Sequence, residues 1–318
     1  MPSIIVLGSV NIDLICRTPA LPLPGETVLG GEFQTAGGGK GANQAVAAVK
    51  ASRGPVVFVA AVGSDANGEQ ALHGFRACGL DTRFVKRSAK PTGVALIVVD
   101  RAGENMIAVA SGANLDLMPA DVDHVPEDVF RAANVFLAPL ESPVETVRRG
   151  LERAKAARLT TIFNPAPVTD AQAVLDLLPL VDVLTPNSRE LAALAQALGA
   201  GKDEKPEQSA ARLVERGCRK LVVTLGSVGC LVVENGDSQM IPAHRAQAVD
   251  ATGAGDAFNG ALAVALSEGR SLAVAAAWAN RAAAIAVGRA GAQPSLATRA
   301  EIEAFGISQT PLPLGEDG

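Results

Sequence analysis

The feature that most constrains the fold of this sequence is the alternation of short, β-rich apolar runs with longer alanine-rich stretches. This alternation is typical of parallel βαβ units, in which helices cover both faces of a sheet. The length of 318 residues fits one large α/β domain or two smaller ones. The predicted strands are 4–7, 56–62, 135–137, 161–163, 181–184, 221–224 and 231–233, and the predicted helices are 42–49, 68–78, 144–157, 188–197, 208–215, 255–266 and 272–287.

Two early segments interrupt this rhythm. Residues 26–35 and 92–105 look extended but are not followed by obvious crossover helices, and the second alternates around VALIVV at 94–99. We expect them to form a small β-layer that projects from the main sheet and is built from separate insertions. The last residues, 310–318, are expected to form a loose tail.

The composition excludes several other classes of protein. Hydrophobic residues make up 48% of the chain, which is enough for a large core and argues against disorder. Lys and Arg total 28 against 33 Asp and Glu, so no net basic field favours nucleic acid. No apolar stretch is long enough to span a membrane, and the N-terminus lacks the basic region of a signal peptide. Four scattered cysteines indicate a reduced, cytoplasmic protein without structural zinc.

The segment DATGAGDAFNG at 250–260 is the most specific candidate for a functional site. Gly253 and Gly255 allow a tight turn and leave backbone N–H groups uncovered where a predicted helix begins. Unpaired donors and the helix dipole favour an anion there. Asp256 lies in the same first turn. A plain turn followed by an N-terminal acidic residue accounts for each feature singly, but it does not account for the whole string.

A second glycine-rich segment, AGGGKGANQ at 36–44, also precedes a predicted helix. It contains G-x-G-x-x-A but follows an extended segment, so it matches a Rossmann dinucleotide site only weakly. Gly41 follows Lys40 where a Walker A loop has Ser or Thr. What remains is a flexible loop with a cation, Lys40, and an amide, Asn43. Both groups suit hydroxyl or phosphate oxygens.

Three further segments place polar residues where predicted strands end, which is where ligands bind in open α/β sheets. Asn11 and Asp13 in GSVNID suit vicinal hydroxyls, or they form an ordinary turn. Asn187 precedes a predicted helix and is either a functional residue or its N-cap. TLGSVG at 224–229 is either a functional loop or a hairpin turn. The residue types leave these alternatives open.

Together these segments resemble the ribokinase (PfkB-type carbohydrate kinase) family over nearly the whole chain. The resemblance implies a single domain over residues 1–308 with a three-layer αβα, doubly wound sheet. It also implies a small β-sheet lid from about 14–36 and 90–110, and a flexible tail at 309–318. The motifs, in the family's order, are GSVNID (8–13), PGET (24–27), GGKGANQAVAA (38–48), PTGVAL (91–96), LESP (140–143), NPAP (164–167), TPN (185–187), TLGSVG (224–229), DATGAGDAFNGAL (250–262) and GAQPS (291–295).

The resemblance implies ATP-dependent phosphorylation of D-ribose at its 5-hydroxyl, with Mg²⁺ and K⁺, in a homodimer that pairs through the lid. Asp256 would accept the hydroxyl proton. After Gly253, the amides of Ala254, Gly255 and Asp256 would form an anion hole. The family's sugar contacts fall on Asn11, Asp13, Gly39, Lys40, Asn43 and Glu141. Its nucleotide contacts fall on Asn187, Thr224, Gly226, Ser227, Gly229, Gly255 and Asn280, and Glu190 fits an element tied to magnesium and phosphate. A loop for a monovalent cation matches Asp250, Thr252, Ala286, Arg289, Gly291 and Ser295.

Two other functions remain compatible with these residues. One is a related kinase acting on deoxyribose, another sugar or a nucleoside, and the other is a non-catalytic sugar sensor. With 3% aromatic residues and no tyrosine, the aromatic walls of a nucleoside pocket are hard to build. A sensor would have no use for Asp256. One departure from the family pattern is the extra glycine at Gly37–Gly38, which we expect to affect the lid edge or dimer packing without touching the contacts named above.

Overall fold

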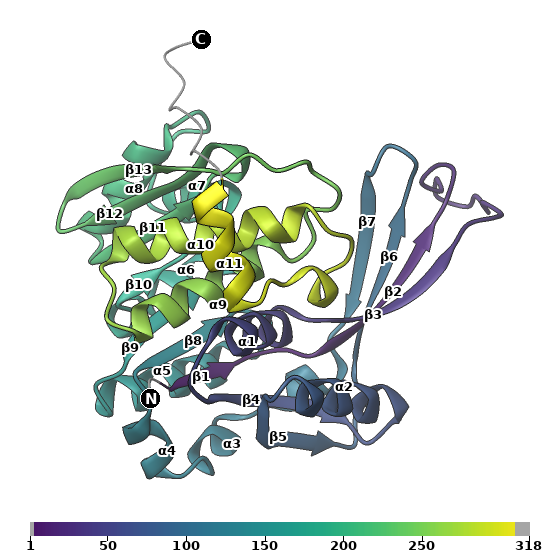
Figure 1. The fold of residues 1–318 in the computed structure, drawn as a ribbon, viewed down its shortest axis with the longest axis horizontal. Helices are drawn as coiled ribbons and strands as arrows, with labels where there is room; N and C mark the ends of the chain where they lie inside the picture. Colours follow the sequence, from purple (N-terminus) through teal and green to yellow (C-terminus); the bar gives the residue numbers. More distant parts are fainter. Residues whose placement is uncertain (1–2, 309–318) are drawn as a thin grey trace.

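Two β-sheets organise the chain in the computed structural model, which describes residues 3–308 (Figure 1). Neighbouring strands of the larger sheet are parallel, except that the second-last strand in chain order is antiparallel to both of its neighbours. The nine strands lie in the spatial order β13 (Asp237–Pro242), β12 (Gly229–Glu234), β11 (Lys220–Thr224), β10 (Val183–Leu184), β9 (Thr160–Asn164), β8 (Val135–Pro139), β1 (Ile4–Leu7), β4 (Val56–Gly63) and β5 (Asp81–Ser88).

Helices cover both faces of this sheet because its central strands are apolar on both sides. In β1, Ile4 and Val6 pack into one core while Ile5 and Leu7 pack into the other. One face carries α1 (Lys40–Ala51), α2 (Ala66–Ala77), α9 (Ala254–Ser267), α10 (Leu272–Val287) and α11 (Arg299–Ser308). The other carries α3 (Pro119–Asp123), α4 (Glu127–Ala132), α5 (Val144–Ala156), α6 (Ala171–Leu175), α7 (Ser188–Ala197) and α8 (Pro206–Glu215). Among residues 3–308, no helix is both long and apolar enough to cross a bilayer.

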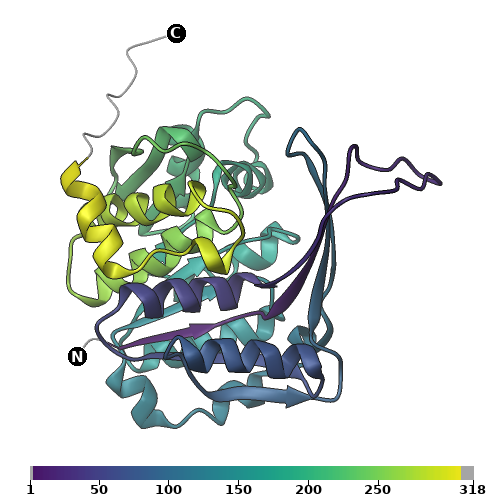
Figure 2. The same cartoon turned by 45° about the vertical axis from the view of Figure 1, so that its right-hand side comes forward.

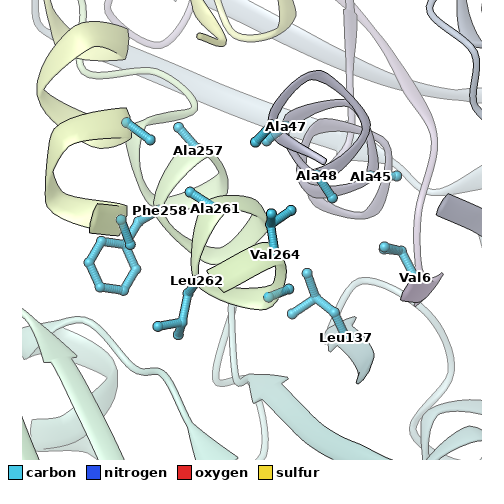
Figure 3. Packing of buried hydrophobic residues seen from close by; sticks show 14 of the residues in the cluster. Val6, Ala45, Ala47, Ala48, Leu137, Ala257, Phe258, Ala261, Leu262 and Val264 are labelled. Atoms are coloured by element: carbon cyan, nitrogen blue, oxygen red, sulfur yellow. The ribbon is translucent and has the colours of Figure 1, made fainter. Parts of the chain in front are cut away.

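The alanine-rich helices α1 and α9 pack closely because their facing side chains are small. Figure 3 shows alanines of both helices at this contact, including Ala48 and Ala261. The approach is closest at Gly260, where a Cβ atom would lie 2.7 Å from the carbonyl oxygen of Gln44 and 2.5 Å from the Cβ of Ala47. Glycine at 260 therefore allows two helices that are far apart in the sequence to lie side by side near their middles.

The second, smaller sheet projects from the main body, as Figures 1 and 2 show from two directions. Its strand β2 follows β1 of the main sheet after residues 8–10. Strand β2 pairs in parallel with β6 of the small sheet. The spatial order is β3 (Phe33–Gly38), β2 (Asn11–Arg17), β6 (Gly93–Val99) and β7 (Asn105–Ala110). A small sheet built from separate segments is therefore present, as predicted.

The boundaries differ from the prediction in several places. The extended segment predicted at 26–35 becomes a strand only from Phe33 onward. The strand predicted at 181–184 contains only Val183 and Leu184, because a 3₁₀ turn occupies Leu178–Leu180 just before it. Edge strands β5 and β13 and helices α3, α4, α6 and α11 were not predicted at all. The predicted tail at 309–318 lies outside the described residues.

Candidate active site

Most of the predicted site residues lie at the carboxyl ends of the parallel strands. β1 is flanked by β4 on one side and β8 on the other, so the strand order reverses at β1. The segment with Asn11 and Asp13 follows β1, and Glu141 follows β8. Asn164 ends β9 and Asn187 follows β10. Crevices at such a reversal point are where open α/β sheets bind ligands.

Both glycine-rich segments open helices that begin at this edge. α1 begins at Lys40 after Gly39, with φ of 86°, and α9 begins at Ala254 after Gly253, with φ of 78°. L-residues with side chains rarely adopt these conformations, so glycine is required at both positions. Within residues 3–308, no side chain caps either helix. The Ala254 amide already donates to the carbonyl of Ala251 at 3.2 Å, which leaves Gly255 and Asp256 as the freer donors of the predicted anion hole.

The carboxylate of Asp256 is buried and held by two side-chain amides. Asn43 Nδ2 donates to its Oδ2 and Gln44 Nε2 donates to its Oδ1, each at 3.0 Å. Burial raises the pKa of Asp256, whereas the positive charge of Lys40 and these two hydrogen bonds act in the opposite direction. The net direction is upward, so the buried carboxylate of Asp256 is a stronger base than an exposed one, while these three groups oppose its protonation.

Two further carboxylates face the same space from other elements. Burial raises the pKa of Asp13 to about 6, and the charges of Glu141 and Asp256 add to this shift. The pKa of Lys40 is raised, chiefly by Asp256. The carboxylates of Asp13, Glu141 and Asp256 with one ammonium provide many acceptors and few donors, an arrangement suited to a ligand that carries several hydroxyl groups.

The polar groups predicted to contact a sugar are fixed by hydrogen bonds within the protein. Glu141 Oε2 accepts hydrogen bonds from the hydroxyl of Ser9 at 2.6 Å and the backbone N–H of Lys40 at 2.9 Å. Asn11 Oδ1 accepts a hydrogen bond from Asn114 Nδ2 at 2.8 Å. Because Asn11 uses its oxygen in this way, its NH₂ group remains available as a donor to a ligand.

A cavity of about 1310 Å³ adjoins the first turn of α9. Seven of the eight residues predicted for the nucleotide line it: Asn187, Thr224, Gly226, Ser227, Gly229, Gly255 and Asn280. Sequence reasoning missed Ser188, the segment 243–248, and Ala251, Phe258, Ala283, Ala284 and Val287 among its lining, and it named Ala254 only for the anion hole. The apolar side chains among them form a wall suited to a flat base. Segment 243–248 has neither an apolar period nor a glycine motif that could have revealed it.

Two of these segments have the structural roles that the sequence left open, and both also line the cavity. Asn187 Oδ1 accepts the N–H of Glu190 at 2.9 Å while Glu190 Oε2 accepts the N–H of Asn187 at 2.8 Å, which makes a capping box at α7. Thr224–Gly229 connects the antiparallel strands β11 and β12. Both segments therefore have structural roles and also line the cavity. Glu190, in the first turn of α7, is not among the residues that line the cavity.

The residues predicted for a monovalent cation lie around a pair of linked loops. Asp250 Oδ1 accepts the N–H of Thr252 and its Oδ2 accepts the N–H of Gly291, both at 2.9 Å. The Arg289 side chain is paired with Glu301 at 2.6 Å, so a contact of Arg289 with a cation would come from its backbone carbonyl. Ala286 and Ser295 belong to the same region, and the Ser295 hydroxyl donates to Ala292. Within the described chain, no group of three His, Cys, Asp or Glu residues is arranged for a metal.

Comparison with known proteins agrees with this geometry. The pattern of the pfkB family carbohydrate kinases matches residues 1–299. The chain belongs to this family. It is 38% identical over 306 residues to a ribokinase of Haemophilus influenzae, covering 94% of this chain and 97% of that protein. A ribokinase structure from Thermotoga maritima superposes with a TM-score of 0.87 at 35% identity, covering 97% of this chain and 100% of the other. The Arabidopsis thaliana ribokinase complexed with ribose and ATP gives a TM-score of 0.83 at 30% identity, covering 96% and 98%.

Membership of the family confirms the predicted fold class: a helix-covered mixed sheet with a smaller separate sheet. One expectation about the site is wrong. Gly38 is not remote from the named contacts, because a Cβ atom there would lie 2.1 Å from Asp13 Oδ1. Gly37 instead faces Gln293, whose Oε1 would be 2.7 Å from an added Cβ. Sequence reasoning also assigned no role to Ser9, Gln44, Asn114 or Asn164, although all but Asn114 lie in the motifs that carried the resemblance.

Proposed function

We propose that this protein transfers the γ-phosphoryl group of ATP to the 5-hydroxyl of D-ribose and releases ADP. The observation that carries the proposal is the position of Asp256. Its buried carboxylate is close to the carboxylates of Asp13 and Glu141, and the residue before it, Gly255, lines the large cavity. A hydroxyl compound and a nucleotide bound on the two sides would therefore meet at the first turn of α9.

Phosphoryl transfer needs positioning and charge stabilisation more than covalent help from the protein. In the proposed reaction, Asp256 takes the proton of the sugar hydroxyl as that oxygen forms its bond to the γ-phosphorus. The bond from phosphorus to the bridging oxygen breaks, and ADP leaves with the electron pair. The N–H groups of Gly255 and Asp256, with that of Ala254 if it leaves the carbonyl of Ala251, would stabilise the charge that develops on the phosphoryl oxygens. The remaining predicted contacts hold the two substrates, with Asn11, Asp13, Gly39, Lys40, Asn43 and Glu141 on the sugar and Asn187, Thr224, Gly226, Ser227, Gly229 and Asn280 on the nucleotide.

Two ions complete the proposal. The donors at Asp250, Thr252, Ala286, Arg289, Gly291 and Ser295 are a carboxylate, backbone carbonyls and hydroxyls, a hard, all-oxygen set that fits potassium. Bound there, potassium would order the loop that leads into α9. Mg²⁺ usually keeps several waters and is held by substrate phosphates with one or two carboxylates. The half-buried carboxylate of Glu190 fits that supporting role. Its Oε2 accepts the hydrogen bond of the helix cap, and its Oε1 takes no part in that bond.

We further propose that two copies pair through their small sheets and that the enzyme works in the cytoplasm. Phe33, Leu96, Met106, Ile107 and Val109 on this sheet are each more than half exposed. Exposed apolar side chains beside open strand edges favour a partner surface. All four cysteines lie in the described chain as free thiols, as a reducing compartment would keep them. Sedimentation at micromolar concentration tests the pairing: a monomer there would contradict it.

An ADP-release assay tests the proposed activity. Wild-type protein and Asp256→Asn are compared with ribose, 2-deoxyribose, fructose and adenosine, each with Mg·ATP in potassium or sodium. We expect the highest kcat/KM for ribose, activation by potassium, and a loss of about 10²–10⁴ in kcat for the variant. A higher kcat/KM for another acceptor would replace ribose as the substrate. ADP release that no acceptor stimulates would instead indicate a sugar sensor.

A further inference from the structure

A line of buried amide and hydroxyl side chains connects Asp256 to the backbone of its own helix. It starts at Gln44, whose Nε2 donates to Asp256 Oδ1 and also to Asn164 Oδ1, both at 3.0 Å. Gln44 is 0% exposed. Both of its N–H groups are therefore committed, one to the carboxylate and one to the end of strand β9.

From Asn164 the line continues across the sheet edge to α9. Asn164 Nδ2 donates to the carbonyl of Thr185 at 2.7 Å, and the Thr185 hydroxyl donates to Asn259 Oδ1 at 2.6 Å. Asn259 Nδ2 then donates to the carbonyl of Gly255 at 2.8 Å. The line thus returns to the residue that precedes Asp256, so it ties the carboxylate and the first turn of α9 to the same two strand ends.

The position of Gln44 is hard to explain by packing alone. Its Oε1 is buried and has no hydrogen-bond partner among the described residues. Leaving a polar atom unpaired in a core is destabilising, and an apolar residue of the same length would avoid it. The orientation of the amide is nevertheless dictated by its neighbour, because turning Oε1 toward Asp256 would place two acceptors together. The amide of Gln44 is therefore oriented so that its NH₂ group binds the Asp256 carboxylate while its own oxygen is left without a hydrogen bond.

We propose that Gln44 is a positioning residue for phosphoryl transfer, which holds the Asp256 carboxylate in register with the N–H groups at the start of α9. This inference rests on the proposed role of Asp256 as the proton acceptor. The close approach of α1 and α9 at Gly260 is what brings Gln44 within reach. Asn43 holds the other carboxylate oxygen, so the two neighbouring amides fix both the position and the rotation of the group.

The electrostatic surroundings make this support sensitive to substitution. Asp256 is faced by the charges of Lys40 from α1 and Glu141 after β8, and it acts in turn on Asp13 in β2 and Glu190 in α7. Burial already raises its pKa, and the amide of Gln44 is among the groups that lower it. Removal of that donor should favour the protonated carboxyl, which cannot accept a proton from the sugar.

The test uses Gln44→Met and Gln44→Glu, with Gln172→Met as the matched control. Gln172 also donates to a carboxylate, Asp176, at 2.7 Å, but on an exposed helix away from the site. We measure kcat and KM for ribose and for ATP from pH 5 to 9. For Gln44→Met we expect kcat to fall about 10-fold to 100-fold, the acidic limb of the pH profile to move up by about one unit, and KM for ATP to stay within about 2-fold. Gln44→Glu, which is nearly isosteric, should lose more because it sets a second carboxyl against Asp256.

The outcomes separate this inference from the proposed function. If Asp256→Asn is inactive and both Gln44 variants keep the wild-type acidic limb, the role of Gln44 is refuted while that of Asp256 stands. A uniform fall in kcat at every pH, with Gln44→Glu more active than Gln44→Met, indicates a purely structural residue and also refutes it. If Asp256→Asn retains full activity, the proposed function itself fails. Should Gln44→Met not fold, the direction of the limb in Gln44→Glu decides the question alone.

Discussion

The side chain of Asn114 holds the start of strand β2 by three hydrogen bonds, two to the backbone of Val10 and one to the side chain of Asn11, a predicted sugar contact. Its Nδ2 donates to Asn11 Oδ1 at 2.8 Å and to the carbonyl of Val10 at 3.1 Å, and its Oδ1 accepts the N–H of Val10 at 2.8 Å. Asn114 is 2% exposed and lies in the turn that follows β7. The turn after the last strand of the small sheet thereby fixes the orientation of Asn11, a predicted sugar contact in β2.

Asn114→Ala should weaken ribose binding without affecting the nucleotide. The substitution removes three buried hydrogen bonds and frees the Asn11 amide to rotate. We expect KM for ribose to rise about 10-fold and the free energy of unfolding to fall by about 2–4 kcal/mol. Steady-state kinetics and urea denaturation measure these effects, and Asn105→Ala on exposed β7 is the control. An equal rise in KM for ATP would contradict the assignment.

The two glycines before the GKGAN segment should respond differently to an added methyl group. In Gly38→Ala the new Cβ would lie 2.1 Å from Asp13 Oδ1, so the carboxylate must move. In Gly37→Ala the neighbour is only the end of the Gln293 side chain, which can turn aside. We expect KM for ribose to rise at least about 10-fold in Gly38→Ala and to stay within about 3-fold in Gly37→Ala. Similar values for the two variants would show that the Asp13 carboxylate is unimportant for the sugar.

The raised pKa of Asp13 predicts that its ionised carboxylate lowers the free energy of unfolding at neutral pH while it serves ribose binding. Its pKa is about 6 in the folded protein against 3.8 ordinarily, so the folded state holds a proton that the unfolded chain has lost. The contribution of this group to stability is therefore present below about pH 4 and is lost as pH rises through about 6. Asp13→Asn should be more stable than wild type at pH 8, by on the order of 1–3 kcal/mol, and equal to it at pH 4.

The same substitution should abolish ribose binding, because the ionised carboxylate is the expected acceptor. In wild type, calorimetric titration with ribose should show affinity that rises from pH 5 to pH 7. A pH-independent affinity, or a variant less stable than wild type at pH 8, would rule out this account of Asp13.

Glu190 has a structural role and a proposed catalytic one, which a single substitution separates. Glu190→Gln keeps an oxygen that can accept the N–H of Asn187, so the melting temperature should change by no more than about 2 °C. The loss of charge should raise the Mg²⁺ concentration needed for half-maximal activity. Asn187→Ala, by contrast, removes the cap itself and should destabilise by about 1 kcal/mol. Unchanged Mg²⁺ dependence in Glu190→Gln would exclude the proposed support of magnesium.

The sequence predicted the buried strands and long helices well, since their patterns arise from local periodicity. Where prediction failed, solvent exposure was the usual reason. β5 carries Asp81, Arg83, Lys86 and Arg87 on an edge of the sheet, and such a strand has no continuous apolar run. β13 at the opposite edge is mostly exposed as well. Short helices such as α3 and α4 have too few turns to show a period.

For the site, the motifs predicted which residues gather but not how they support one another. Gln44 and Asp256 are separated by 212 positions, and Asn114 and Asn11 by 103. Which side chains form these hydrogen bonds depends on how helices cross and in which order strands lie. The residue types alone do not carry this information. The capping box of Asn187 and Glu190 is the exception, because both partners lie within one turn.

The continuity of β1 into β2 has a mechanical consequence. Ile4–Leu7 pairs with two strands inside the main sheet, while Asn11–Arg17 belongs to the projecting sheet. Residues 8–10 connect the two. Asn11 and Asp13 lie directly after this connection. We therefore expect ribose bound beside Asn11 and Asp13 to change the angle between the projecting sheet and the main sheet.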